Sequence, residues 1–90
     1  MKISLHKKFK KDVERVKKRG KDIEKLKTLI QKLSDGIPLG GGARLHPLKG
    51  KFQGQYECHL EDDWLVIYEI DKMNRILTLI RTGSHDDLGV

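Results

Sequence analysis

The chain has 90 residues, and its 19 lysines and arginines outnumber its 13 aspartates and glutamates, which gives a formal net charge of +6 at pH 7. A chain of this length folds as one small domain over residues 1–90, and its single cysteine excludes a disulfide framework and fits the cytoplasm. No apolar run resembles a signal peptide or the about 20 apolar residues of a membrane span, so no membrane partner is expected.

The positive charge is concentrated in the first third of the chain. Residues 1–35 hold 13 lysines and arginines against 5 acidic residues, whereas residues 36–90 hold 6 against 8. A one-sided basic surface is typical of proteins that bind a polyanion such as a nucleic acid. The alternative is a solvated helix face that only keeps the protein soluble.

The N-terminal half predicts a short strand followed by two helices. Residues 2–5 alternate polar and apolar side chains, as a strand does. A first helix ends at Gly20, and its apolar residues recur at helical spacing: Leu5, Phe9, Val13 and Val16. Asp22 can cap a second helix, whose apolar stripe comprises Ile23, Leu26, Leu29, Ile30 and Leu33. Together they predict an αα-hairpin with an apolar inner face and a basic outer face.

The C-terminal half predicts a loop and then three strands. Residues 35–42 contain Asp-Gly, a proline and three glycines, which is typical of a loop; they lack the lysine and serine of a phosphate-binding P-loop. Strands are expected at 55–61, 64–70 and 75–81, and the hydrophobic run 64–70 suits a central strand. The order β-α-α-β-β-β predicts an α+β fold, with the N-terminal strand and the αα-hairpin packed on a small antiparallel β-sheet.

Three of the four histidines, together with one arginine, are the candidates for chemistry. His46, His59 and His85 can each give or take a proton near neutral pH, and Arg81 can bind a phosphate through a two-pronged donor. This set predicts cleavage of a phosphodiester without a metal. A zinc site is the weaker interpretation, because the three histidines lie 13 and 26 residues apart with no short pair. His6 is expected at the surface.

The residues around the second of these histidines allow several interpretations. Glu57 and Glu61 share a strand face with His59 and are expected to raise its pKa, whereas Cys58 points the other way into the core. Asp63 either orients a histidine or belongs to the turn at 62–63. Trp64 either stacks on a base or packs in the core.

Four ordered segments are similar to motifs of a known family. They are His46-Pro47-Leu48-Lys49-Gly50, Tyr56-Glu57-Cys58-His59, Asp63-Trp64-Leu65-Val66-Ile67-Tyr68 and Arg81-Thr82-Gly83-Ser84-His85-Asp86-Asp87-Leu88. With the basic αα-hairpin before them, essentially the whole chain resembles the YafQ group of RelE/ParE-superfamily toxins. One departure is Gly89, where family members commonly carry an aromatic residue.

The resemblance implies a bacterial type II toxin that cuts messenger RNA in the ribosomal A site and is silenced by a cognate antitoxin. It implies a RelE-like fold, and the implied mechanism needs no metal or cofactor. A base would remove the ribose 2′-OH proton, the oxygen would attack the phosphorus, and an acid would protonate the leaving 5′-oxygen, giving a 2′,3′-cyclic phosphate. The implied catalytic residues are His46, His59, Asp63, Arg81 and His85; which histidine is base and which is acid stays open.

The resemblance also gives the basic residues a use, because lysine contacts to RNA phosphates provide affinity without reading sequence. The candidates for RNA binding are Lys7, Lys8, Lys10, Lys11, Lys17, Lys18, Lys49, Lys51 and Trp64. Two alternatives remain: a non-catalytic ParE-like inhibitor of DNA gyrase, and a plain RNA-binding module. The first needs no clustered histidines, and the second usually relies on exposed aromatic pairs for stacking.

Overall fold

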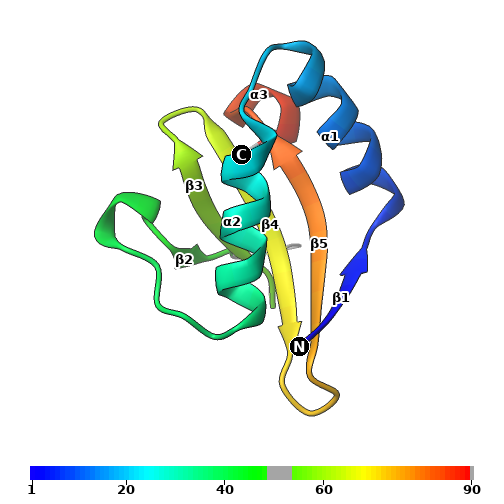
Figure 1. Cartoon of the computed structure of the whole chain (residues 1–90), viewed down its shortest axis with the longest axis vertical. Coiled ribbons are helices and arrows are strands. Elements are labelled where there is room, and N and C mark those ends of the chain that lie inside the picture. Colours follow the sequence, from blue (N-terminus) through cyan, green and yellow to red (C-terminus); the bar gives the residue numbers. More distant parts are fainter. Residues whose placement is uncertain (49–53, 90) are drawn as a thin grey trace.

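A five-stranded sheet with helices on both faces forms the domain in the computed structural model, which describes residues 1–48 and 54–89 (Figure 1). The strand order is β1-β5-β4-β3-β2. The elements in chain order are β1 (Lys2–Leu5), α1 (Lys7–Lys18), α2 (Ile23–Ser34), the short 3-10 helix η1 (Gly41–Ala43), β2 (His46–Pro47), β3 (Tyr56–Glu61), β4 (Trp64–Asp71), β5 (Ile76–Gly83) and α3 (His85–Leu88).

The α+β fold is confirmed, but the orientation of the first strand is a correction. Strands β2 to β5 are antiparallel neighbours, whereas β1 pairs in parallel with β5, from Lys2 opposite Ile76 to Leu5 opposite Leu79. The sheet is therefore mixed and not fully antiparallel. A parallel pair needs a long crossover connection, and residues 6–75 supply it.

Local sequence signals set the ends of the two long helices. The His6 side chain accepts a hydrogen bond from the Lys8 backbone N–H at 3.2 Å and so caps α1. After α1 the chain turns at Gly20, whose φ of +83° suits glycine. Asp22 then caps α2 by accepting from the Glu24 N–H at 3.0 Å. The helical spacing of Leu5 and Phe9 predicted that Leu5 belongs to the first helix, but Leu5 is the last residue of β1.

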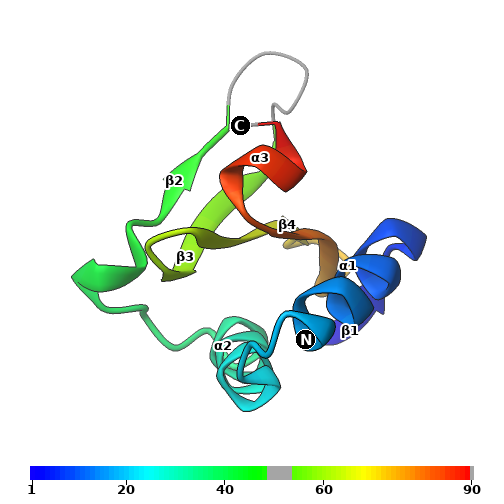
Figure 2. The same ribbon diagram turned by 90° about the horizontal axis from the view of Figure 1, so that it is seen from above.

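Both long helices cover one face of the sheet and bury most of the core there (Figure 2). Cys58 and Trp64 are almost fully buried on this face, and burial raises the pKa of the Cys58 thiol to about 12. We call this buried set the helix-side core; it comprises Phe9, Val16, Leu26, Leu29, Leu33, Cys58, Trp64, Val66, Tyr68, Leu77 and Leu79.

The opposite face, which we call the far face, has a much smaller buried set. Leu65 and Ile67 of β4 pack there with Leu88 of α3. The central position of β4 is confirmed, because both of its faces are buried. Figure 2 shows α3 on this side, across the sheet from α1 and α2. No helix among the described residues is long and apolar enough to cross a membrane.

Three short elements lie where the sequence predicts only loops. The 3-10 helix η1 and strand β2 occupy the expected loop and the stretch after it, and α3 follows β5 directly. Helix α3 begins with a capping box, in which Ser84 and Asp87 bond each other's backbone N–H groups. With one turn of helix and two residues of strand, these segments are too short for a hydrophobic period to reveal.

Candidate active site

Strand register brings three of the candidate residues onto the far face. His46 on β2 pairs with Glu57 on β3, and Glu57 pairs with Ile67 on β4, which in turn lies opposite Arg81 on β5. In the next row, His59 pairs with Leu65, which lies opposite Gly83. Directly opposed residues of antiparallel strands point to the same face, so these rows share the far face.

His46 is held by a buried carboxylate. Its Nε2 lies 2.5 Å from Glu57 Oε2, and the imidazole is half exposed whereas the Glu57 side chain is buried. The residue after His46 is Pro47, and together they make strand β2. The sequence analysis expected Glu57 to act on His59, but the Glu57 carboxylate pairs with His46. The signal for this pairing is the antiparallel register between β2, which has only two residues, and β3.

His59 and His85 lie against each other. Their ring centroids are 5.6 Å apart and their planes are tilted by 44°. His59 is only 8% exposed, and its Nδ1 has no hydrogen-bond partner among the described residues. His85 approaches from the start of α3, where Gly83 and Ser84 redirect the chain across the far face.

The expectation of a raised pKa for His59 is wrong. Burial lowers the pKa of His59, and the nearby Arg44 guanidinium lowers it further, while Glu57 acts in the opposite direction. Glu61 is not available to raise it, because a bulge interrupts the register between His59 and Glu61. The Glu61 carboxylate instead binds Lys21 at 2.8 Å and Lys25 at 3.1 Å.

Asp63 holds His85 by two hydrogen bonds. Asp63 Oδ1 accepts from the His85 backbone N–H at 2.8 Å and lies 2.7 Å from His85 Nδ1. These two hydrogen bonds lower the pKa of the Asp63 carboxyl, so it is ionised at neutral pH. A carboxylate at Nδ1 fixes the tautomer that carries its proton there and leaves Nε2 available for a substrate. Both interpretations of Asp63 hold, because it lies in the turn between β3 and β4 and its carboxylate binds His85.

Arg81 is bound by an acidic residue of α1. Its Nε donates to Asp12 Oδ2 at 2.6 Å and its Nη2 to Asp12 Oδ1 at 3.2 Å, which leaves Nη1 without a partner among the described residues. This pairing raises the pKa of Arg81, which stays cationic. Sequence reasoning missed Asp12. The available signal was an acidic residue on the apolar stripe of the first helix, three positions after Phe9 and four before Val16.

A second ion pair fixes α3, the helix that carries His85. Asp87 accepts from Arg19 at 2.6 Å and lies 3.6 Å from Arg15, and the hydrogen bond from Arg19 is the largest cause of a strongly lowered Asp87 pKa. Gly83 is needed beside it, because a Cβ at that position would lie 2.8 Å from Asp87 Oδ2. Asp87 was also missed, although the spacing Ser84 to Asp87 is a capping-box signal.

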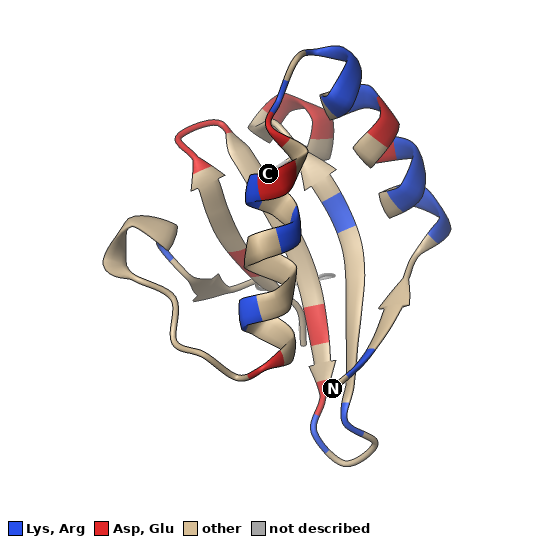
Figure 3. Ribbon diagram, in the orientation of Figure 1, with Lys and Arg blue, Asp and Glu red and all other residues tan. Residues whose placement is uncertain are grey.

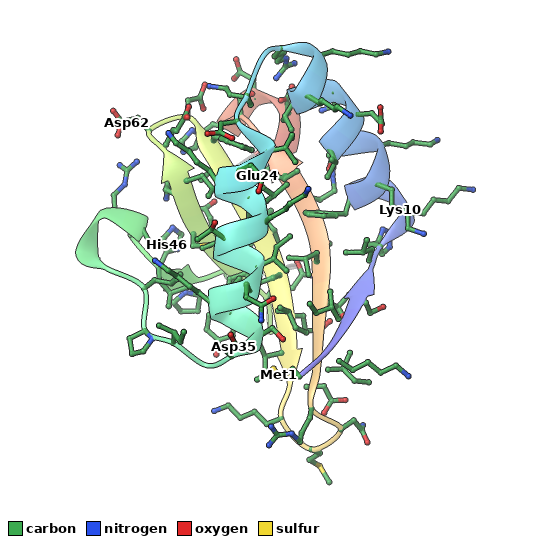
Figure 4. All side chains as sticks on the ribbon, in the orientation of Figure 1. Met1, Lys10, Glu24, Asp35, His46 and Asp62 are labelled. Atoms are coloured by element: carbon green, nitrogen blue, oxygen red, sulfur yellow. The ribbon has the colours of Figure 1, made fainter. Side chains whose placement is uncertain are left out.

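The candidate RNA-binding residues divide into three groups. Figure 3 shows that most of α1 is coloured as lysine or arginine, and Figure 4 shows the labelled Lys10 on the outer side of the helix. The α1 lysines among the candidates are all exposed: Lys7, Lys8, Lys10, Lys11, Lys17 and Lys18. Lys49 and Lys51 lie outside the described residues. Trp64 is a correction, because it is 1% exposed and its Nε1 donates to Thr82 Oγ1 at 3.0 Å, so the indole packs in the helix-side core and cannot stack on a base.

No group of three or more histidine, cysteine, aspartate or glutamate side chains is placed to hold a metal ion within residues 1–48 and 54–89. The arrangement that is present consists of imidazoles with carboxylates behind them and a guanidinium in a neighbouring row. Chemically, such a set can transfer protons and bind a phosphate.

Comparison with known proteins adds the family. Residues 1–90 match the family described as the bacterial toxin of the type II toxin–antitoxin system, YafQ. The mRNA interferase toxin YafQ of Escherichia coli K12 is 38% identical over 78 residues, which cover 86% of this chain and 83% of that protein.

Solved structures agree with this match. A metal-bound toxin from Helicobacter pylori is 39% identical, with a TM-score of 0.92 and 98% of both chains covered. YafQ in the E. coli DinJ–YafQ toxin–antitoxin complex is 37% identical, with a TM-score of 0.86, covering 96% of this chain and 93% of that one. The chain therefore belongs to the YafQ family of bacterial type II toxins.

Proposed function

We propose that this protein is an endoribonuclease that cleaves messenger RNA on the ribosome, as the toxin of a type II toxin–antitoxin pair. The relative in E. coli K12 is an mRNA interferase toxin, which supports this activity class. The observation that carries the proposal is the contact between His59 and His85, with Asp63 holding Nδ1 of His85. It provides an oriented imidazole on an exposed face, as transfer of a proton to or from RNA requires.

The reaction is an internal attack of RNA on its own backbone. A base takes the proton from a ribose 2′-OH, and the 2′-oxygen forms a bond to the adjacent phosphorus. The bond from phosphorus to the 5′-oxygen of the next nucleotide breaks, and an acid gives that oxygen a proton. The products are a 2′,3′-cyclic phosphate and a 5′-hydroxyl end, and no water is consumed in this step.

We assign a role to each candidate residue of the far face. His46 and His85 are the two proton-transfer groups, because each has an exposed imidazole backed by a carboxylate, Glu57 or Asp63. His59, whose pKa is lowered by burial, is neutral at pH 7 and acts as a hydrogen-bonding partner beside His85. Each group that transfers a proton in this way accelerates a reaction by about 10²–10⁴-fold.

Arg81 stabilises the charge that develops on the phosphoryl oxygens. Its Nε edge is occupied by Asp12, so a phosphate would approach the free Nη1 end of the guanidinium. A fixed donor aimed at a developing negative charge lowers the barrier because it needs no reorganisation during the reaction.

The exposed lysines of α1 supply affinity for ribosomal RNA. Within residues 1–48 and 54–89, the ion pairs of α1 involve Asp12, Arg15 and Arg19, and none involves these lysines. Each lysine that contacts a phosphate releases counterions, so binding should weaken steeply with salt.

The protein partner is a cognate antitoxin. YafQ of E. coli is seen in a complex with DinJ, a toxin–antitoxin complex. An acidic segment that folds on binding would complement the basic surface of α1 and mask the far face. We place the protein in the cytoplasm, where ribosomes and mRNA are found.

The test is cleavage of a defined message on programmed ribosomes, with the new 5′ ends mapped. We expect His85→Ala to reduce cleavage by about 10²–10⁴ while the fold survives, because the side chain is 44% exposed. The matched control is His6→Asn, which removes the histidine that caps α1 but keeps an N-cap acceptor. Full cleavage by His85→Ala would overturn the proposal, and ribosome binding without cleavage by the unmodified protein would favour a plain RNA-binding module.

A further inference from the structure

We infer that Asp12 is a positioning residue for Arg81, and that helix α1 thereby sets Arg81 and His85 relative to one another. This inference rests on the proposed function, because it gives Asp12 a part in the same reaction. Asp12 is 1% exposed, and it contacts the reacting groups only through Arg81.

Asp12 occupies a place that a strand would otherwise fill. Strand β1 ends at Leu5, opposite Leu79, so beyond that point no strand of the described residues pairs with β5 on the side away from β4. The backbone N–H of Thr82 on that edge donates to Asp12 Oδ2 at 3.2 Å. The Asp12 carboxylate therefore accepts from a buried backbone N–H next to Arg81 on β5.

The hydrogen bonds to Asp12 fix the plane of the guanidinium. Nε donates to Oδ2 at 2.6 Å and Nη2 donates to Oδ1 at 3.2 Å, so two parallel bonds restrain both the direction and the rotation of the group. An arginine at a strand end without such a partner would sample many rotamers. Nη1 has no partner among the described residues, so that end of the guanidinium is available to a ligand, and the Arg81 side chain is 25% exposed.

The same helix also holds the segment that carries His85. Arg15 lies 3.2 Å from Asp12 Oδ1 and 3.6 Å from Asp87 Oδ1, and Arg19 binds Asp87 at 2.6 Å. Asp87 in turn bonds the backbone N–H of Ser84 at the start of α3. A continuous series of ion pairs thus joins Arg81 to the helix of His85 through one face of α1, so a change at Asp12 should affect chemistry and not RNA binding.

The variant that tests this is Asp12→Asn. The asparagine oxygen can still accept from Thr82 N–H and from Arg81 Nε, but its NH₂ group replaces Oδ1 and faces Arg81 Nη2 and Arg15, so the bond from Nη2 that orients the guanidinium is lost. We expect single-turnover cleavage on programmed ribosomes to fall by about 10- to 100-fold, as for a small misplacement of a catalytic group. Affinity for the ribosome should not weaken, because the lysines of α1 are unchanged.

The matched control is Glu14→Gln on the same helix. It changes the net charge by the same amount, and Glu14 is exposed with no ion pair among the described residues. We expect it to cleave as the unmodified protein does. Equal losses for both variants would show an effect of helix charge and would overturn the positioning role.

A double-mutant cycle with Arg81→Ala separates positioning from general stability. If Asp12 acts through Arg81, adding Asp12→Asn to Arg81→Ala should cause no further loss of cleavage. A further loss as large as the one that Asp12→Asn causes when Arg81 is present would mean that Asp12 acts independently of Arg81, and the inference would fail.

A second measurement does not depend on catalysis. The NMR signal of the Arg81 Nη2 hydrogen that is bonded to Asp12 Oδ1 should be protected from exchange with water in the unmodified protein, and Asp12→Asn should increase its exchange rate. If the protein cleaves no RNA, the proposed function fails, while this signal still tests the contact. An exchange rate that Asp12→Asn leaves unchanged would overturn the inference even in an active enzyme.

Discussion

The two faces of the sheet differ in what they do with buried side chains. On the helix-covered face, eleven residues form one continuous apolar core under α1 and α2. On the far face, Leu65, Ile67 and Leu88 form a small apolar set, and the buried positions beside it hold Glu57 and His59. The first face supplies most of the hydrophobic stabilisation, which scales with apolar area removed from water.

This difference explains how so small a domain keeps ionisable groups partly buried. Burying a charged carboxylate is costly unless it is paired, and on the far face the buried Glu57 carboxylate is paired with His46. The domain separates stability from chemistry by face. Changes to the helix-side core should therefore unfold the protein, and changes to the far face should alter activity first.

The largest effect on stability is expected for Trp64→Ala. Removing this fully buried indole leaves a cavity in the helix-side core and should lower the free energy of unfolding by about 3–5 kcal/mol, measured by denaturant unfolding. Trp64→Phe is the control, since it keeps most of the volume and loses the hydrogen bond to Thr82. If the alanine variant were as stable as the phenylalanine variant, the assignment of stability to this face would be wrong.

An intermediate effect is expected for Gly83→Ala. The added methyl would meet Asp87 Oδ2 at 2.8 Å, and the φ of +153° is unfavourable for alanine, so we expect a loss of about 1–3 kcal/mol in thermal unfolding. Gly40→Ala is the matched control: its φ is −68° and no atom lies within 4 Å of the new Cβ. That variant should be neutral or slightly more stable. Equal stability of the two variants would contradict the packing of α3 described above.

A smaller effect concerns pH and tests the buried histidine. The pKa of His59 is lower in the folded protein than its ordinary value of 6.5, so the unfolded chain binds more protons below that pH. Stability contributed by the neutral form is complete above pH 6.5 and declines as the pH falls toward the lowered pKa. Unfolding at several pH values should show this decline in the unmodified protein and a weaker one in His59→Gln. The same decline in both would assign it to other groups.

The smallest effect per residue is expected on α1. Lys10→Gln should weaken ribosome binding slightly and reduce the slope of log affinity against log salt by about 1, if Lys10 contacts one phosphate. Lys72→Gln, in the β4–β5 turn at the other end of the molecule, is the control of equal charge. A slope that both variants leave unchanged would remove α1 from the RNA-binding surface.

Much of the fold follows from periodicity, and much of the site does not. The alternation in β3, the long apolar run of β4, the Asp22 cap of α2 and the glycine after α1 are local signals, so their approximate positions were predictable, whereas the His6 cap of α1 was not predicted. The pKa direction of His59 was not, because a bulge and the pairing of Glu61 with two lysines of another element remove the carboxylate that alternation places beside it. The partner of Arg81 was equally hidden, since Asp12 is 69 residues away in the chain.

The single thiol of the chain has a practical use. Cys58 lies in the helix-side core with no exposed surface, and its pKa of about 12 keeps it protonated and unreactive near neutral pH. A maleimide or disulfide reagent can therefore reach it only when β3 separates from the helices. The rate of labelling then measures opening of the domain directly. Every variant described above can therefore be ranked for stability without introducing another cysteine.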